Sequence, residues 1–144
     1  MERRVLIALL WGSLLLPPAS AAEPKVILPD ALHWASPPWE PAVHAAWVLG
    51  SEQTGGAYLL RVRIAPGGEI PPHIHPDERY TTVLSGTLHV SFGPDFNSAR
   101  TLVLPAGSVY VAPANQPHFV WAEVSDVIYQ EAGTGPTATL FMEH

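Results

Sequence analysis

Two histidines separated by a single residue, His73 and His75, are the strongest candidates for chemistry in this sequence. On an extended chain, residues two apart point to the same side, so both imidazoles project from one face. Imidazole nitrogens are common ligands of divalent transition metals, and two on one strand can hold neighbouring positions around an ion. The sequence contains no cysteine, so a metal site in this chain must use His, Asp or Glu side chains.

A third histidine, His118, begins an apolar run that follows the turn-forming residues 113–117. If the strands pair as in a jelly roll, its side chain can face the first two histidines. Three neutral histidines are a sufficient shell for zinc or ferrous iron, and they leave open positions for water or a substrate oxygen. We therefore predict His73, His75 and His118 as ligands of a divalent transition metal, with Fe, Mn and Zn as the candidates.

Short strands must position these histidines, because prolines and glycines are spread along the chain and leave little room for long helices. Residues 57–65 alternate, with Tyr58, Leu60, Val62 and Ile64 on one face. Further runs of strand character, separated by turn signals rich in Gly and Pro, cover residues 80–84, 87–92, 101–104, 108–112, 118–121, 126–132 and 138–142. Many short strands at regular spacing predict an all-β sandwich or barrel.

The first 21 residues have the order basic, apolar, small that is typical of a signal peptide. Arg3 and Arg4 come first, residues 5–16 form the apolar core, and residues 19–21 give the small-x-small pattern of a cleavage site. The alternative, a buried N-terminal helix, would be ended early by the two prolines that follow the apolar core. We therefore predict export to the periplasm of a bacterium or beyond it, with residues 1–21 removed. No second long apolar run follows, so we expect no membrane insertion after the leader is removed.

Two regions follow the leader. Residues 22–56 form an N-terminal extension, in which residues 43–49 alternate like a strand. We expect the stretch before residue 43 to wrap across the barrel or onto a second subunit. Residues 57–144 form the barrel domain, which is long enough for a single core.

The spacing around the first histidine pair resembles the first sequence motif of the cupin superfamily. Gly67 is followed after five residues by His73-x-His75, after three more by position 79, and after six more by Gly86. The second cupin motif is matched by Gly107, then five residues, Pro113-x-Asn115, two residues and His118. The resemblance covers about residues 57–132 and is similar to a branch of small single-domain bacterial cupins.

The resemblance implies a cupin jelly-roll barrel, the double-stranded β-helix, whose histidines line an open pocket. It also implies pairing of barrels by strand exchange, so the N-terminal extension is expected to act as a dimer arm in a homodimer. One departure from the second motif is mild: Asn115 stands where cupins usually carry glycine, and Asn also tolerates a left-handed backbone.

A second departure is severe, because Arg79 stands where cupins usually place a glutamate ligand. Two unit charges ~4 Å apart repel by about 4 kcal/mol at an effective dielectric constant of ~20, and a divalent ion would feel roughly twice that. Three arrangements would resolve the conflict. Arg79 swings away to pair with Asp77 or Glu78, it binds an anionic ligand that also reaches the metal, or the site holds no metal.

Several other polar side chains are weaker candidates. We expect Arg79, Tyr110 and Gln130 to bind the substrate, with Arg79 clamping a carboxylate through two parallel hydrogen bonds. His89 sits in the alternating run 87–92 and is expected to be an ordinary sheet residue. The two histidines of the N-terminal extension, His33 and His44, lie outside both motifs.

The formal net charge of −6 makes nucleic acid and anionic lipid poor partners. A small anionic organic molecule is the expected ligand. Two functions remain open. One is a metal-dependent enzyme, and the other is a non-catalytic small-molecule-binding or sensing module that needs no metal.

Overall fold

A computed structural model describes residues 22–95 and 100–142, and the predicted leader, residues 1–21, lies outside them. Helical structure in this part of the chain is confined to a 3-10 turn, η1 (Pro29–Ala31), and no described helix is long and apolar enough to cross a membrane. The strands follow the predicted runs to within a few residues, except that those runs omit β3. They are β1 (Val43–Leu49), β2 (Gly56–Ile64), β3 (Glu69–Ile74), β4 (Arg79–Ser85), β5 (Thr87–Phe92), β6 (Thr101–Pro105), β7 (Val109–Ala112), β8 (His118–Trp121), β9 (Val127–Gly135) and β10 (Leu140–Phe141).

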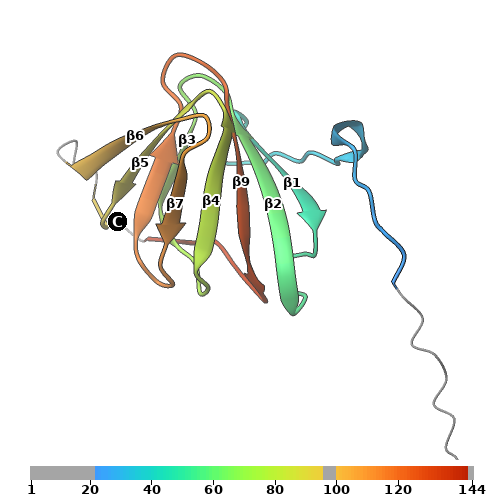
Figure 1. The fold of residues 1–144 in the computed structure, drawn as a ribbon. Coiled ribbons are helices and arrows are strands. Elements are labelled where there is room, and N and C mark those ends of the chain that lie inside the picture. Colours follow the sequence, from blue (N-terminus) through green and yellow to red (C-terminus); the bar gives the residue numbers. More distant parts are fainter. Residues whose placement is uncertain (1–21, 96–99, 143–144) are drawn as a thin grey trace, which may run out of the picture.

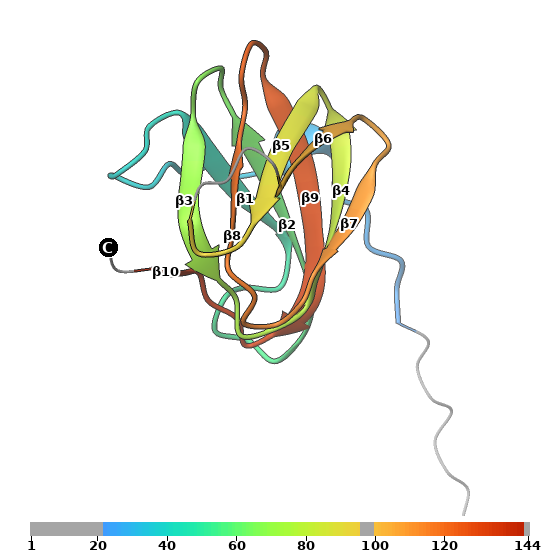
Figure 2. The ribbon, with the colours of Figure 1, turned by 90° about the vertical axis from the view of Figure 1, so that its left-hand side faces the viewer.

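The strands form two five-stranded sheets that lie face to face (Figures 1 and 2). One sheet has the order β1-β2-β9-β4-β7, and the other has the order β10-β3-β8-β5-β6. Every pairing between the described strands is antiparallel. This arrangement is a jelly-roll β-sandwich. It confirms the predicted all-β class, with the strands in two facing sheets rather than one closed barrel.

An apolar core fills part of the space between the sheets. Val83 and Val127 come from one sheet and Leu88, Val90 and Val120 from the other, and none is more than 2% exposed. Burying one such side chain contributes roughly 1.5–3 kcal/mol relative to leaving it in water. This cluster therefore gives the sandwich a rigid interior against which a binding site can be built.

The two prolines of β3, Pro71 and Pro72, interrupt the ladder that joins this strand to β8. The register shifts between Ile70 and His73, after which His73 pairs directly with His118. Proline has no backbone N–H to donate, so it is tolerated at such an irregularity and not in a regular central ladder. The shift places two of the three predicted ligands opposite each other on neighbouring strands.

Two turns with a left-handed backbone fix the ends of these strands. Gly86 joins β4 to β5 with φ of +74°, and a Cβ at this position would lie 2.2 Å from the Asp126 carbonyl oxygen. Asn115, before β8, has φ of 60°, as expected for an asparagine that replaces a glycine. The Asn115 N–H donates to the His75 carbonyl at 2.7 Å, so this turn is tied to the chain just after β3.

The residues before β1 lie along that strand at the edge of the first sheet. Ala35 forms an antiparallel bridge with Ala45, with hydrogen bonds of 2.9 and 2.8 Å. The first described residues, blue in Figure 1, lead away from β1. The strand predicted over residues 43–49 is confirmed as β1. The segment before it pairs with β1 at Ala35, on the edge of the chain's own sheet.

Candidate metal centre

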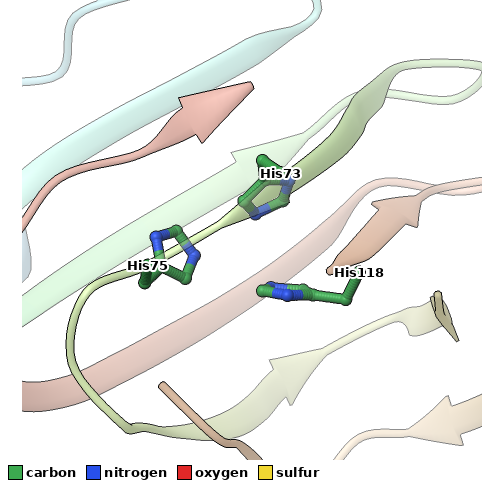
Figure 3. Close-up of side chains that lie close together, drawn as sticks. All are labelled: His73, His75 and His118. Atoms are coloured by element: carbon green, nitrogen blue, oxygen red, sulfur yellow. The ribbon is translucent and has the colours of Figure 1, made fainter. Parts of the chain in front are cut away.

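The register of β3 and β8 brings the three predicted histidines together. His73 and His118 face each other across the two strands with ring centroids 4.3 Å apart, and cross-strand pairs of this kind share one face of the sheet. His75 follows two residues after His73, with centroids 4.8 Å from His73 and 5.2 Å from His118. One ring nitrogen of each residue lies within 4.8 Å of the others, and the rings point toward one another (Figure 3).

Backbone carbonyls hold all three rings through the same nitrogen. His73 Nδ1 lies 2.6 Å from the Pro71 oxygen, and His75 Nδ1 lies 2.8 Å from the Ala138 oxygen. His118 Nδ1 lies 3.1 Å from the oxygen of Gln116, two residues before it. A carbonyl can only accept a hydrogen bond, so each Nδ1 carries the proton and each Nε2 keeps a free lone pair.

This tautomer is the one that a metal requires when Nε2 is the ligand atom, and metal-binding histidines commonly have such a partner on the other nitrogen. The Nε2 atom of His75 is buried and has no hydrogen-bond partner among the described residues. An unpaired buried polar atom is costly, and a divalent cation would satisfy it. The donor set therefore fits a transition metal, which would be held by His73, His75 and His118.

Burial keeps the three imidazoles neutral, which is also the state that binds metal. Desolvation, with contributions from the neighbouring His118 and His75, lowers the pKa of His73 to about 3. Desolvation and the positive charge of Arg79 lower the pKa of His75 to about 3. Burial also lowers the pKa of His118. At neutral pH the cluster therefore presents lone pairs and no charge.

These shifts predict that the metal-free protein loses stability in acid. The imidazoles titrate near 6.5 when unfolded, and His73 and His75 near 3 when folded, so between these values the unfolded state binds more protons. The histidine contribution is complete above about pH 6.5 and is lost as the pH falls toward about 3. The measurement is the free energy of unfolding against pH, in chelator, for the wild type and a His73→Gln/His75→Gln variant. Parallel curves for the two proteins would contradict the assignment.

Arg79, the unexpected residue of the first motif, is buried in a hydrogen-bonded ion pair. Its side chain is 3% exposed, and its Nη1 donates to Glu131 Oε2 at 2.6 Å. Nη2 donates to Thr137 Oγ1 at 2.8 Å and to the Ala138 carbonyl at 3.4 Å. The remaining nitrogen, Nε, lies 3.8 Å from Asp77 Oδ1. The guanidinium fork is therefore already occupied by the protein.

A second layer of contacts holds this pair in place. Thr137 donates to Asp77, and the Tyr58 hydroxyl donates to the same carboxylate at 2.6 Å. The Arg79 guanidinium also lies over the Tyr58 ring, 5.6 Å from its centroid. Burial alone would lower the pKa of Arg79, but the charge of Glu131 and other nearby groups outweighs it and the pKa is raised. Arg79 is thus a permanent cation flanked by two carboxylates.

This geometry corresponds to the first of the three arrangements considered for Arg79, because Asp77 is one of its ion-pair partners, and it adds a closer partner that was not considered, Glu131. The guanidinium has turned to Glu131, with Asp77 farther away. Glu78 is exposed and accepts a hydrogen bond from the Tyr80 hydroxyl instead. At His118 the charge of Glu131 outweighs that of Arg79 in its effect on the pKa, whereas at His75 the charge of Arg79 outweighs that of Asp77.

Glu131 is the functional candidate that the sequence analysis missed. It is 5% exposed and shares the inward face of β9 with Val127 and Tyr129, which are buried as well. Alternation along this run was the available signal, because an acid at the parity of two apolar residues must enter the interior. Its partner was not predictable in this way, since the pairing depends on β9 lying beside β4.

His73, His75, Arg79 and Glu131 line a cavity of about 580 Å³ between the sheets, whereas His118 does not line it. Its walls come from β1, β2, β9 and the end of β10, and residues of the N-terminal extension, including His33 and Trp39, also line it. The volume is in the range of sites for small organic molecules.

The other polar residues considered in the sequence lie outside the histidine cluster. Tyr110 is buried in the apolar core and does not line the cavity. Gln130 lies on the opposite face of β9 from Glu131 and accepts a hydrogen bond from Arg61 at 2.8 Å. His89 is buried and stacked on Trp121 in β8, outside the cluster. The site as built therefore contains neither Tyr110 nor Gln130, because strand alternation and sheet order carry them elsewhere.

Comparison with known proteins gives a consistent picture. The family model described as a cupin domain matches residues 60–128. Germin-like protein 1-1 of Oryza sativa subsp. japonica is 36% identical over 88 residues, which cover 60% of this chain and 37% of that protein. The alignments thus span about a third of the length of the curated relatives.

Solved structures share the fold. The polyketide cyclase RemF from Streptomyces resistomycificus superposes with a TM-score of 0.67 at 18% identity, over 85% of this chain and 89% of that one. Oxalate oxidase in complex with the substrate analogue glycolate has a TM-score of 0.52 at 29% identity, over 60% of this chain and 46% of that one. With two facing antiparallel sheets, both motifs and a cluster of three inward histidines, this chain belongs to the cupin superfamily.

Proposed function

We propose that this cupin binds a divalent transition metal (Fe, Mn or Zn) through His73, His75 and His118 and acts on a small anionic organic molecule. One observation carries the proposal: the three Nδ1 atoms are committed to backbone carbonyls, which leaves three Nε2 lone pairs free in a cluster whose ligand atoms lie within 4.8 Å of one another. A bound metal would supply Lewis acidity and open positions for oxygen donors.

The protein's own residues define what such a ligand meets. The histidines fix the position of its anionic group, because a cation held by three neutral ligands keeps its full charge. The sequence suggests Arg79 as a carboxylate clamp, and in the structure two nitrogens of its guanidinium donate to Glu131 and Thr137. We assign Arg79 the role of a positioning residue that holds Glu131 beside the cavity.

The names of the similar proteins support a small acid as the ligand. Oxalate oxidase is among the structures that match, one of them with glycolate as a substrate analogue, and an oxalate decarboxylase formate complex from Lactobacillus farciminis matches as well. Oxalate and glycolate are two-carbon acids, and formate is a one-carbon acid. They motivate oxalate and glycolate as the first compounds to test here.

A non-catalytic binding or sensing module is the alternative, and one observation favours it. Glu131, the buried carboxylate of the cavity lining, is engaged by Arg79 and is not placed as a free base. The two functions separate in one assay, in which metal-loaded protein is incubated with excess oxalate or glycolate. Product in excess of the protein concentration indicates an enzyme, whereas saturable binding without product indicates a binding module.

We also propose export and a homodimer, as the leader sequence and the N-terminal extension suggest. The order of basic, apolar and small residues over 1–21 supports export. The first described residues, which lead away from the sandwich, are the segment with which a second subunit would be contacted.

Metal content decides the metal half of the proposal. Protein purified from its native compartment without a histidine tag is expected to carry close to one equivalent of a transition metal, measured by elemental analysis. His118→Ala should lose this metal, because the two remaining imidazoles bind a divalent ion much more weakly than three do. His89→Gln is the matched control, since His89 is also buried but lies outside the cluster. No metal after purification, and none after reconstitution at neutral pH, would overturn the proposal.

A further inference from the structure

A row of aromatic rings leads from the histidine cluster to the outer rim of the cavity. Phe141 lies beside His73, with centroids 6.0 Å apart, because the two residues pair across β10 and β3. Trp39 packs edge-to-face on Phe141, with centroids 4.9 Å apart and an interplanar angle of 76°. Trp39 and Phe141 keep 48% and 43% of their surface exposed, although both line the cavity. Exposed aromatic faces beside a cavity are costly in water and are typical of binding surfaces.

The opposite walls of the cavity are also apolar. Leu60 and Val62 from β2, Ile70 from β3 and Val43 from β1 line it. The buried polar side chains of the lining come from the end of β3 and the residue after it, from β4 and from β9, and they are His73, His75, Arg79 and Glu131. The other polar residues of the lining are exposed or half-buried, and they are His33, Ser36, Glu52 and Thr139. A ligand matched to this cavity therefore has one polar end and a larger apolar body.

The size of the cavity also indicates a ligand larger than a two-carbon acid. Oxalate has six non-hydrogen atoms, and at roughly 30 Å³ for each, the share of a water molecule in the liquid, it would fill about 180 Å³. The cavity measures about 580 Å³. A two-carbon acid would thus leave the aromatic rim and most of the apolar wall in contact with water.

We propose that the ligand is a flat aromatic molecule with oxygen donors at one end, and that Trp39 and Phe141 hold its ring. This inference rests on the proposed metal function for the oxygen end only. The donors bind the metal on the three histidines, and the ring lies along Phe141 toward Trp39. The N-terminal extension thereby becomes the part of the chain that selects the ligand.

The segment that carries Trp39 is held in place by the protein. The Ala35–Ala45 bridge anchors it on one side. On the other side, Glu40 closes a turn: its side chain accepts from the Ala42 N–H at 2.9 Å and its carbonyl accepts from the Val43 N–H at 3.1 Å. A fixed aromatic wall gives affinity without an ordering cost on binding.

Trp34 provides a matched control in the same segment. It is 39% exposed, and it lies beside His44 and Arg63 instead of lining the cavity. Trp34→Ala and Trp39→Ala therefore remove equivalent indole rings from different surfaces.

Two hydroxamates with the same metal-binding group test the ring site in metal-loaded protein. Benzohydroxamate is expected to bind at least about tenfold more tightly than acetohydroxamate by isothermal titration calorimetry, because only its ring is buried in the cavity. Trp39→Ala should reduce this ratio severalfold and leave acetohydroxamate affinity unchanged. Trp34→Ala should change neither value, and Trp39→Phe should restore most of the ratio. Equal affinities for the two hydroxamates in the wild type would overturn the inference.

A metal-free arm separates this inference from the metal proposal. With chelator present, 2-naphthol is expected to bind the wild type and Trp34→Ala alike, and at least about threefold more weakly to Trp39→Ala. If the protein takes up no metal, the metal function fails and this arm alone decides. Naphthol binding that depends on Trp39 supports the ring site, and no binding, or binding unaffected by Trp39→Ala, overturns it.

Discussion

Arg79→Ala is expected to lower the free energy of unfolding by about 3–5 kcal/mol, the usual cost of breaking a buried ion pair from one side. The substitution leaves Glu131 without its 2.6 Å partner and removes the cation beside Asp77. Glu131 is 5% exposed, so its carboxylate would be left largely desolvated, with water reaching it only from the cavity. The measurement is urea unfolding at pH 7 by linear extrapolation.

Arg63→Ala is the control for this experiment. Arg63 is also an arginine in an ion pair, with Asp126, but the two side chains are 50% and 41% exposed. Exposed pairs of this kind contribute about 1 kcal/mol or less. Similar losses for the two variants would show that the Arg79 pair is solvated in solution and that burial does not set its strength.

His75→Ala is expected to abolish the stabilisation of the protein by metal. A ligand present at ~100 times its dissociation constant stabilises the folded state by about 2.7 kcal/mol, because it binds the folded protein alone. His75 Nε2 is a buried nitrogen without a hydrogen-bond partner among the described residues, so its removal takes away a ligand that the fold has already oriented. The measurement is the shift in Tm on adding Zn²⁺ or Mn²⁺ to chelator-treated protein.

The control here is His44→Ala. His44 lies on β1, its ring is hydrogen-bonded to Ser36 of the N-terminal extension, and it is outside the cluster, so this variant should keep the full metal-dependent shift. The comparison is made between shifts and not between absolute Tm values, since each substitution also changes the metal-free protein. A full shift in His75→Ala would place the metal elsewhere in the chain.

The strands and the histidine cluster were predictable because both depend on local patterns. Alternation in β2 and the Gly and Pro turns define short strands without knowledge of their neighbours. The spacing of His73 and His75 fixes their common face, and the resemblance of both motifs to cupins placed His118 opposite. β3 was not among the predicted strand runs, because prolines at positions 71 and 72 are unusual inside a strand.

The charge arrangement around Arg79 was not predictable from spacing. Its partner comes from β9, and only the sheet order β9-β4 makes the two neighbours. Gln130 is a residue for which strand alternation alone could have corrected the prediction. Alternation already separates it from Tyr129, so the two could not both face the cavity, and the structure turns Gln130 outward to Arg61.

The position of Trp39 at the cavity depends on contacts between residues still farther apart in the sequence. Trp39 reaches the cavity because residues 33–39 run beside β1, and because Phe141 of β10 pairs with His73. Neither pairing leaves a trace in the local sequence. The sequence left open whether the N-terminal extension wraps across the chain's own barrel or onto a second subunit. Residues 33–39 contribute to the chain's own cavity, and the dimer arm stays a prediction.

The shared acceptor of His75 and Arg79 has a consequence for the order of events during protein synthesis. Both side chains donate to the Ala138 carbonyl, and Arg79 also needs the Thr137 hydroxyl. A nascent chain that has just exposed both motifs lacks these two residues, so His75 has no acceptor to fix its tautomer. Because chains fold as they emerge from the N-terminal end, the geometry of the histidine cluster is completed by residues made after both motifs. A metal bound through these histidines would therefore meet a fully oriented His75 only after residues 137 and 138 have been made.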